Sequence, residues 1–155
     1  MTSIYSSAET QATGAARRDF VGAKVMLFFG DSMAILRRDH SPGIPWPGRL
    51  DFPGGGRETD ESPETCVIRE TAEELGTLIR PRDLVFAAVH AGARGASWFF
   101  AAHLPAERLR DVRFGGEGAG WCIMTPEAYC AAPDAIPHFS AILSAYWRRG
   151  AKGEG

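Results

Sequence analysis

A helix with recognisable signals at both ends constrains the fold of this chain most strongly. Ser62 is a favoured N-cap residue, Pro63 stands at the first helical position, and Gly76 can end the helix about four turns later. Because both ends are fixed, any strands can lie only in the segments before and after it. The pattern therefore predicts one capped helix flanked by sheet-forming segments.

Apolar, β-compatible runs occupy those segments. Two pairs of runs are each separated by a short glycine-containing turn, which predicts two hairpins, and one more run follows. The five runs are residues 22–30, 33–39, 83–92, 96–104 and 120–125. A brief strand is expected over residues 49–52, and further helices are expected from Thr125 and over residues 137–150. Strands mixed with a few helices predict an α/β (α+β) layered domain without repeats.

The length of the chain limits the number of domains. With 155 residues, of which 45% are hydrophobic, the chain can form one sizeable core but not two ordinary domains. Residues 1–18 are polar and aperiodic, so they are predicted to form a flexible tail, and residues 150–155 are expected to form another. The predicted domain therefore spans residues 19–149.

Charge and composition exclude several classes of function. The net charge of −2 and the pI near 6.1 leave no basic surface for polymeric nucleic acid. No run approaches the roughly 18 apolar residues of a membrane span, and the first residues lack a secretory signal. Cys66, Cys122 and Cys130 are odd in number without CxxC spacing, so they are expected to be buried thiols in a reducing compartment. We therefore expect a cytoplasmic protein with no membrane partner.

Three glutamates share one face of the predicted helix. Glu70, Glu73 and Glu74 fall within an arc of roughly 100°. The opposite face, which is expected to be buried, carries Ile68, Ala72 and Leu75. A solvated surface is one interpretation, but like charges one turn apart repel one another. A hard divalent cation such as Mg²⁺ would resolve the conflict, because it prefers carboxylate and water oxygens.

A glycine triplet precedes this helix. Gly54, Gly55 and Gly56 allow the backbone to come close to a ligand or a metal ion. The segment does not fit a phosphate-binding P-loop, because no Gly-Lys-Ser/Thr sequence ends it. A plain turn is the alternative interpretation.

Together, the glycines and the charged residues resemble a known motif. Residues 55–77 match the Nudix box of the Nudix hydrolases at every charged and glycine position. The matching residues are Gly55, Glu61, Arg69, Glu70, Glu73, Glu74 and Gly76. The sequence DFPGG before the box looks like the usual lead-in, and Glu58 matches an acidic position often seen in the loop. Thr71 and Thr77 stand where the family prefers aliphatic residues, and Asp60 replaces a usual glycine.

The resemblance implies a fold, a reaction and a cofactor. The implied fold is a Nudix-type α/β/α sandwich with a mixed β-sheet in a single domain. The implied reaction is hydrolysis of the diphosphate linkage of a nucleoside diphosphate derivative, with Mg²⁺ or Mn²⁺ as the cofactor. Carried over to this sequence, Glu70, Glu73 and Glu74 are metal ligands, and the carbonyl of Gly55 joins them.

Further residues receive roles from the same resemblance. Arg69 and Glu61 would form the ion pair that orients Glu70. The sequence GGEGAGW is similar to a stretch of the MutT branch whose glutamate reaches the metal ions, so Glu117 is a candidate metal ligand or general base. Glu74 is the competing base, and an ordinary turn glutamate is the alternative interpretation of Glu117.

Aromatic residues are the candidates for substrate binding. Phe52, His138 and Phe139 could stack on a nucleobase or hydrogen-bond to it, and for each of them a place in the core is the alternative. His90 and His103 lie in apolar runs and are interpreted as structural histidines.

The leading function is that of a MutT-like nucleotide pyrophosphatase. It would hydrolyse a (d)NTP or an oxidised (d)NTP to NMP and pyrophosphate, because GGEGAGW is present and the markers of other branches are missing. Hydrolysis of ADP-ribose, nucleotide sugars or dinucleoside polyphosphates is the alternative within the family. A non-catalytic Nudix-fold nucleotide-binding module, or a domain without any ligand, is the alternative outside enzymes. The expected partner is a small-molecule nucleotide, and a homodimer fits the resemblance, because dimers are common among similar proteins.

Overall fold

Seven strands form one mixed β-sheet in the computed structural model, which describes residues 19–153 and their side chains as far as residue 150. The strands are β1 (Phe20–Phe29), β2 (Ser32–Arg37), β3 (Leu50–Asp51), β4 (Gly54–Gly56), β5 (Leu84–Gly92), β6 (Gly95–Leu104) and β7 (Gly120–Met124). The helices of this part are α2 (Pro63–Leu75), α3 (Pro126–Ala131) and α4 (Pro137–Gly153), with 3-10 turns at η1 (Pro81–Asp83) and η2 (Ala106–Asp111). The predicted tail over residues 1–18 lies outside the described residues.

Strands β1 and β2 diverge within the sheet. They pair antiparallel only beside their hairpin turn, where Phe28 lies opposite Met33 and Phe29 opposite Ser32. Farther from the turn, β1 pairs antiparallel with β4, while β2 pairs with β3 and β7. On its other side β1 runs parallel to β6, and β6 pairs antiparallel with β5. Both predicted hairpins are therefore confirmed, and two short strands, β3 and β4, fill the region where β1 and β2 separate, while β7 pairs along the other edge of β2.

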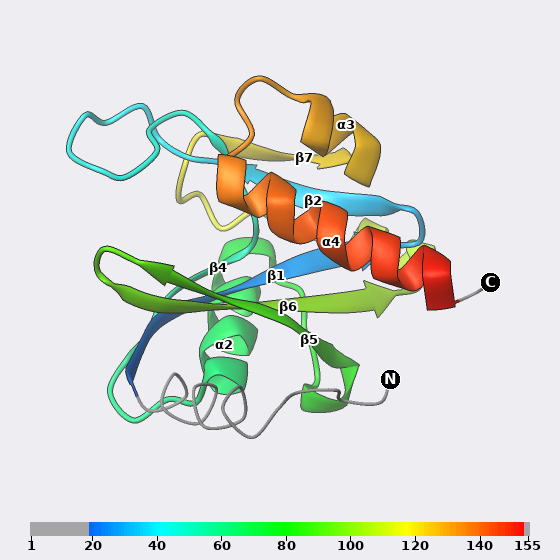
Figure 1. The fold of residues 1–155 in the computed structure, drawn as a ribbon, viewed down its shortest axis with the longest axis horizontal. Helices are drawn as coiled ribbons and strands as arrows, with labels where there is room; N and C mark the ends of the chain where they lie inside the picture. Colours follow the sequence, from blue (N-terminus) through cyan, green and yellow to red (C-terminus); the bar gives the residue numbers. More distant parts are fainter. Residues whose placement is uncertain (1–18, 154–155) are drawn as a thin grey trace.

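Helices cover both faces of the sheet (Figure 1). On one face, Cys66 and Val67 of α2 pack against alternate residues of β1 and β6. On the other face, Tyr129 of α3 and Leu143 of α4 pack against the intervening residues of the same two strands, β1 and β6. Successive side chains of a strand point to opposite faces, so the same strands serve both cores. This arrangement confirms the α/β/α sandwich with a mixed sheet.

Helix α2 begins and ends where the sequence predicts. The Ser62 hydroxyl accepts a hydrogen bond from the Thr65 N–H, and Gly76 ends the helix in the left-handed conformation with a φ of 63°. Its buried face differs from the predicted one, because Thr71 is buried and Ala72 is exposed. The prediction for Ala72 is wrong because the helix is turned by roughly 100°, one residue position, from the expected orientation.

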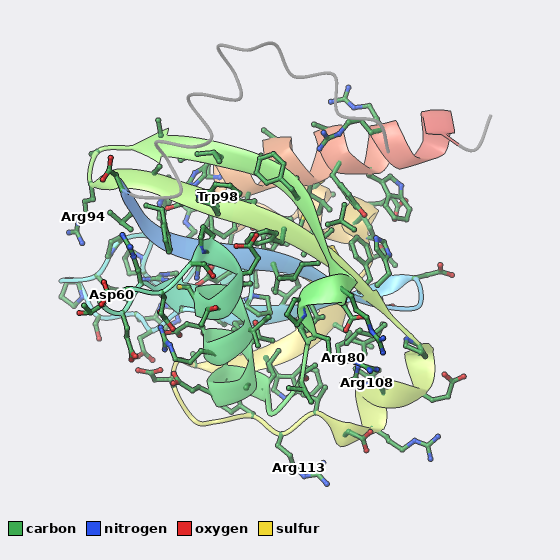
Figure 2. All side chains as sticks on the ribbon, turned by 90° about the horizontal axis from the view of Figure 1, so that it is seen from below. Asp60, Arg80, Arg94, Trp98, Arg108 and Arg113 are labelled. Carbon is green, nitrogen blue, oxygen red and sulfur yellow. The ribbon has the colours of Figure 1, made fainter. Side chains whose placement is uncertain are left out.

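The turn before α2 explains one departure from the family pattern. Asp60, labelled in Figure 2, has a φ of 65°. This left-handed region favours glycine, and aspartate is one of the few other residues that tolerate it. The usual glycine at this position therefore has a conformational reason, and Asp60 keeps the same backbone shape.

Two further predictions need correction. Helix α4 continues to Gly153, past the predicted domain boundary at residue 149, since alanine and lysine in its last turn are good helix formers. Cys66 is buried as expected, but Cys122 and Cys130 are exposed, because they lie on β7 and α3 at the margin of the structure. No helix within the described residues is long and apolar enough to cross a membrane.

Candidate active site

A cleft of about 350 Å³ lies where β1 and β2 diverge. Four residues that the sequence predicts for the site line it: Gly55 on β4, Glu70 and Glu74 on α2, and Glu117 before β7. The cleft is also lined by five charged residues that the sequence reasoning missed, Lys24, Arg37, Arg38, Asp39 and Asp51. Carboxylates and cations therefore meet in one cleft.

Helix α2 presents two of its three glutamates to this cleft. Because its buried face is turned, Glu70 and Glu74 flank that face and reach the cleft. Glu73 lies farther round the helix, where its side chain is 57% exposed and contacts Arg69 at 3.3 Å. The structure thus brings Glu70 and Glu74 together and leaves Glu73 outside the cleft.

Arg69 connects the acidic residues of the box. Its guanidinium donates to both oxygens of Glu61, from Nε at 2.6 Å and from Nη2 at 2.9 Å. Nη1 donates to Glu70 at 2.9 Å, and Nη2 also donates to the Gly56 carbonyl at 2.9 Å. The hydrogen bonds between them lower the pKa of Glu61 and raise the pKa of Arg69, so both stay charged. One arginine therefore connects Glu61, Glu70 and the end of β4.

Glu70 lies directly against the backbone of Gly55. A methyl group added to Gly55 would lie 2.5 Å from Glu70 Oε2, which is closer than real contacts of this kind. The Gly55 carbonyl accepts a weak hydrogen bond from the Cys66 thiol at 3.5 Å. Burial raises the pKa of Cys66 to about 11, so this thiol keeps its proton at neutral pH. Glycine at position 55 is thus required for Glu70 to take this position.

Glu74 is a largely buried carboxyl group with one backbone partner. Its Oε1 accepts a hydrogen bond from the Gly54 N–H at 2.7 Å. Burial raises the pKa of Glu74 to about 7, whereas the charge of Lys24 and the Gly54 hydrogen bond lower it. The carboxylates of Asp51 and Glu70 raise it further. Near neutral pH, Glu74 can therefore hold a proton or help to hold a cation.

Glu117 reaches the cleft because the loop before β7 is fixed to the end of α2. The Arg113 N–H donates to the Leu75 carbonyl at 2.7 Å, and the Gly115 N–H donates to the Glu74 carbonyl at 2.8 Å. These bonds satisfy carbonyl groups that a helix end would otherwise leave free. Glu117 itself is exposed in the cleft, so a bound water can reach its carboxylate.

Lys24 and Asp51 form a charged network that the sequence reasoning missed. Asp51 is only 5% exposed, and its Oδ2 accepts hydrogen bonds from Lys24 Nζ at 3.1 Å and from Arg38 Nη1 at 2.9 Å. Lys24 Nζ also donates to the Gly54 carbonyl at 3.1 Å. A lysine within the apolar run GAKVMLFF was the available signal, because a buried charge needs a partner.

The two arginines of the cleft also hold the loop that follows β2. Arg37 Nη1 donates to the Gly48 carbonyl and to Asp134, both at 2.8 Å, and Arg38 Nε donates to the Pro45 carbonyl at 2.8 Å. Within the described part of the chain, Nη2 of Arg37 and of Arg38 has no hydrogen-bond partner. Each guanidinium therefore keeps donors for an anion.

The three predicted substrate-binding residues have different environments. Phe52 is fully buried and Phe139 is 5% exposed, so the prediction that they contact a nucleobase is wrong, because both fill the core beneath α4. His138 is only partly buried and stacks on His90 with ring centroids 4.0 Å apart. The ring centroids of Trp46 and His138 are 6.1 Å apart, and Trp46 is 41% exposed. Of the three, His138 alone reaches the surface.

The cleft residues fit a divalent cation of the Mg²⁺ type. Such an ion is usually bound through one or two carboxylates and keeps several water ligands. Glu70 and Glu74 supply two carboxylates, and a cation would relieve the unfavourable charge that raises the pKa of Glu74. No three acidic, histidine or cysteine side chains converge into a metal cluster within the described residues. The fit is therefore to an ion held by two glutamates with backbone and water oxygens.

Comparisons with known proteins identify the fold. Solved structures with the same fold include the MutT protein of Methanosarcina mazei Go1, with a TM-score of 0.66 and 19% identity over 83% of this chain and 93% of that chain. The Ap4A hydrolase of C. elegans has a TM-score of 0.68 and 18% identity over 84% of this chain and 98% of that one. A mutT/nudix family protein from Listeria innocua has a TM-score of 0.65 and 20% identity over 84% of this chain and 94% of that chain. At these identities the likeness shows the fold alone.

The family is shown by the sequence. No curated protein matches the chain. The model of the NUDIX domain, however, matches residues 19–145, which is most of the chain and includes the whole cleft. The chain therefore belongs to the Nudix family and is a hydrolase that acts on pyrophosphate bonds.

Proposed function

We propose that this protein is a metal-dependent pyrophosphohydrolase of nucleoside triphosphates, oxidised ones included, that releases a nucleoside monophosphate and pyrophosphate. One observation carries the proposal: a single cleft contains the carboxylates of Glu70 and Glu74 together with the guanidinium groups of Arg37 and Arg38. A polyphosphate bound through a divalent cation needs both kinds of group.

We assign the metal ion to Glu70 and Glu74, with the carbonyl of Gly55 beside them. When bound, Mg²⁺ or Mn²⁺ would offset the charge of the phosphates and make water a better nucleophile. Arg69 keeps Glu70 oriented, and Glu61 keeps Arg69 oriented through two hydrogen bonds. The mechanism therefore depends on residues of the box that never contact the substrate.

Two carboxylates are candidates for the base that accepts the proton of the attacking water. Glu74 is fixed by the Gly54 N–H and lies in the same cleft as the assigned metal ion. Glu117 lies exposed in the same cleft. Measuring activity against pH for Glu74→Gln and for Glu117→Gln would decide between the two candidates. The variant that lacks the base should lose the rise of activity with pH.

The cationic part of the cleft would bind the phosphates, and the aromatic surface beyond it would bind the base. Among the residues that the structure describes, Arg37 and Arg38 keep guanidinium donors without a protein acceptor. Trp46 and His138 belong to a partly exposed aromatic pair, and rings of this kind stack on any nucleobase. This arrangement favours recognition of the triphosphate over strict selection of the base.

A substrate panel tests the proposal. The purified protein would be incubated with Mg²⁺ and dGTP, 8-oxo-dGTP, ADP-ribose, a nucleotide sugar or diadenosine tetraphosphate, and the products would be resolved. We expect a nucleoside monophosphate and pyrophosphate from a triphosphate, at a higher rate than any other cleavage. Preferred cleavage of ADP-ribose, the nucleotide sugar or the dinucleotide would instead assign the protein to another substrate class of the family.

The same panel separates an enzyme from a binding module. A non-catalytic module would cleave nothing, while a nucleotide would still raise its melting temperature. We expect turnover because Glu61, Arg69, Glu70, Glu73 and Glu74 are all present. A cytoplasmic location and a homodimer stay predictions made from the sequence.

A further inference from the structure

Lys24 is a charged residue inside the cleft that the box motif does not include. It is one of only two lysines in the sequence, the other being Lys152. It lies on β1 within an apolar run, and its side chain is 16% exposed. An ammonium group in such a place loses much of its hydration and requires acceptors from the protein.

The ammonium group of Lys24 connects two segments of the cleft. Its Nζ donates to Asp51 Oδ2 and to the Gly54 carbonyl, both at 3.1 Å. Asp51 comes from β3 and Gly54 begins β4, so Lys24 fixes the short connection between these strands to β1. Lys24 therefore holds the carbonyl side of Gly54, while the peptide before Gly54 is held by the Val25 N–H, which donates to the Pro53 carbonyl at 2.9 Å.

Gly54 in turn positions Glu74. The Gly54 N–H donates to Glu74 Oε1 at 2.7 Å, within the range of strong bonds to a carboxylate. Gly54 has a φ of 129°, and a side chain there would clash with the Ala23 carbonyl oxygen, so no other residue can take over this contact. The amide and the carbonyl of one glycine thus connect Lys24 to Glu74.

We propose that Lys24 is a positioning residue for the hydrolysis, because it binds the carbonyl of Gly54, the residue whose N–H holds the carboxylate of Glu74. The inference rests on the proposed function, in which Glu74 acts at the reacting phosphate. An ammonium group has three N–H donors, and two of them are used here. In the proposed role Lys24 acts through these two protein acceptors, so loss of its charge should affect turnover more than substrate affinity.

The test replaces Lys24 by a residue of similar length without charge. In Lys24→Met, Asp51 keeps its hydrogen bond from Arg38, so the buried carboxylate is not left without a partner. Lys152→Met is the matched control, because it removes the only other lysine by the same change. Lys24→Arg, which keeps the charge, is the second variant if Lys24→Met does not fold, and it should show a smaller loss in the same direction.

We expect kcat of Lys24→Met to fall by about 10- to 100-fold, while KM for the nucleotide stays within about threefold, as for other residues that orient a ligand of the site. Lys152→Met should match the wild type. A kcat of Lys24→Met within about twofold of the wild type would overturn the proposal. A raised KM with an unchanged kcat would also overturn it, because that result indicates direct contact with the substrate.

A second readout needs neither metal nor turnover. In the metal-free protein, the Gly54 amide signal should show the downfield proton shift of a hydrogen bond to a carboxylate. We expect Lys24→Met to move this signal towards its position in Glu74→Gln, and Lys152→Met to leave it unchanged. An unmoved signal in Lys24→Met would refute the positioning role. If the wild type cleaves no substrate of the panel, the proposed function fails, and this signal still decides whether Lys24 positions Glu74.

Discussion

Among single residues, Glu74 combines burial with unfavourable charge. Burial, together with Asp51 and Glu70, raises its pKa to about 7 from an ordinary value of 4.5. A carboxyl group whose pKa is higher in the folded protein than in the unfolded chain binds its proton more tightly when folded. The metal-free protein should therefore lose stability as the pH rises from about 4.5 through 7.

Glu74→Gln tests this conclusion in the metal-free protein. Glutamine keeps an oxygen for the Gly54 N–H but cannot ionise, so the variant should be more stable than the wild type at pH 8.5, by on the order of 2 kcal/mol, and should lose this advantage at pH 5. Urea unfolding at both pH values measures the difference. Glu73→Gln is the matched control, because Glu73 is exposed. An equal stability difference at both pH values would contradict the account.

Residues of the site could be predicted only where a local motif contains them. Glu70 and Glu74 follow from spacing along one helix and do line the cleft. Lys24 and Asp51 are far apart in the sequence and meet only because β1 and β3 border the same cleft. Phe52 was misassigned, because an aromatic residue of a core and one of a binding surface look alike in a sequence.

At the scale of elements, α2 was predictable and β4 was not. Local signals fix both ends of α2, namely the Ser62 cap and the left-handed Gly76. Strand β4 consists of three glycines, which have little tendency to form strands, and it forms because β1 pairs with it over residues 22–24. Tertiary pairing thus places Gly55 against Glu70.

The contact between β4 and α2 gives a sharp prediction. In Gly55→Ala, the new methyl group must displace the Glu70 carboxylate, so activity should fall at least about tenfold. The melting temperature should change little, because the end of the Glu70 side chain can move away. In the adjacent control, Gly56→Ala, the methyl group meets no atom within 4 Å. Assays and thermal unfolding of both variants check this, and equal activity of the two variants would refute the assigned contact.

For the molecule as a whole, the cleft is a consequence of the way the sheet opens. β1 stays paired to β6 along its length, while β2 leaves β1 after two residue pairs and pairs with β3 on the same edge. The sequence predicts both hairpins, but no local pattern in it indicates that β1 and β2 diverge after their turn. The sandwich itself was predictable through the resemblance to the family, because a motif of this length is tied to one fold.

Binding of a cation at this cleft should stabilise the whole domain. Mg²⁺ at about 100 times its dissociation constant would add about 2.7 kcal/mol to the free energy of unfolding, which corresponds to several degrees in melting temperature. NaCl at the same ionic strength is the control, because it screens charges without binding between two glutamates. Equal shifts with MgCl₂ and NaCl would show that the cleft does not hold the ion.

The central claim is that Glu70 and Glu74 in this cleft support metal-dependent hydrolysis. The most direct measurement is the rate of pyrophosphate release from dGTP, with Mg²⁺ and with EDTA, for the wild type, Glu70→Gln, Glu74→Gln and the exposed control Glu73→Gln. We expect Mg²⁺-dependent release that falls by several orders of magnitude in the first two variants and much less in the third. Release by folded Glu70→Gln and Glu74→Gln at the wild-type rate, or release that persists in EDTA, would contradict the claim.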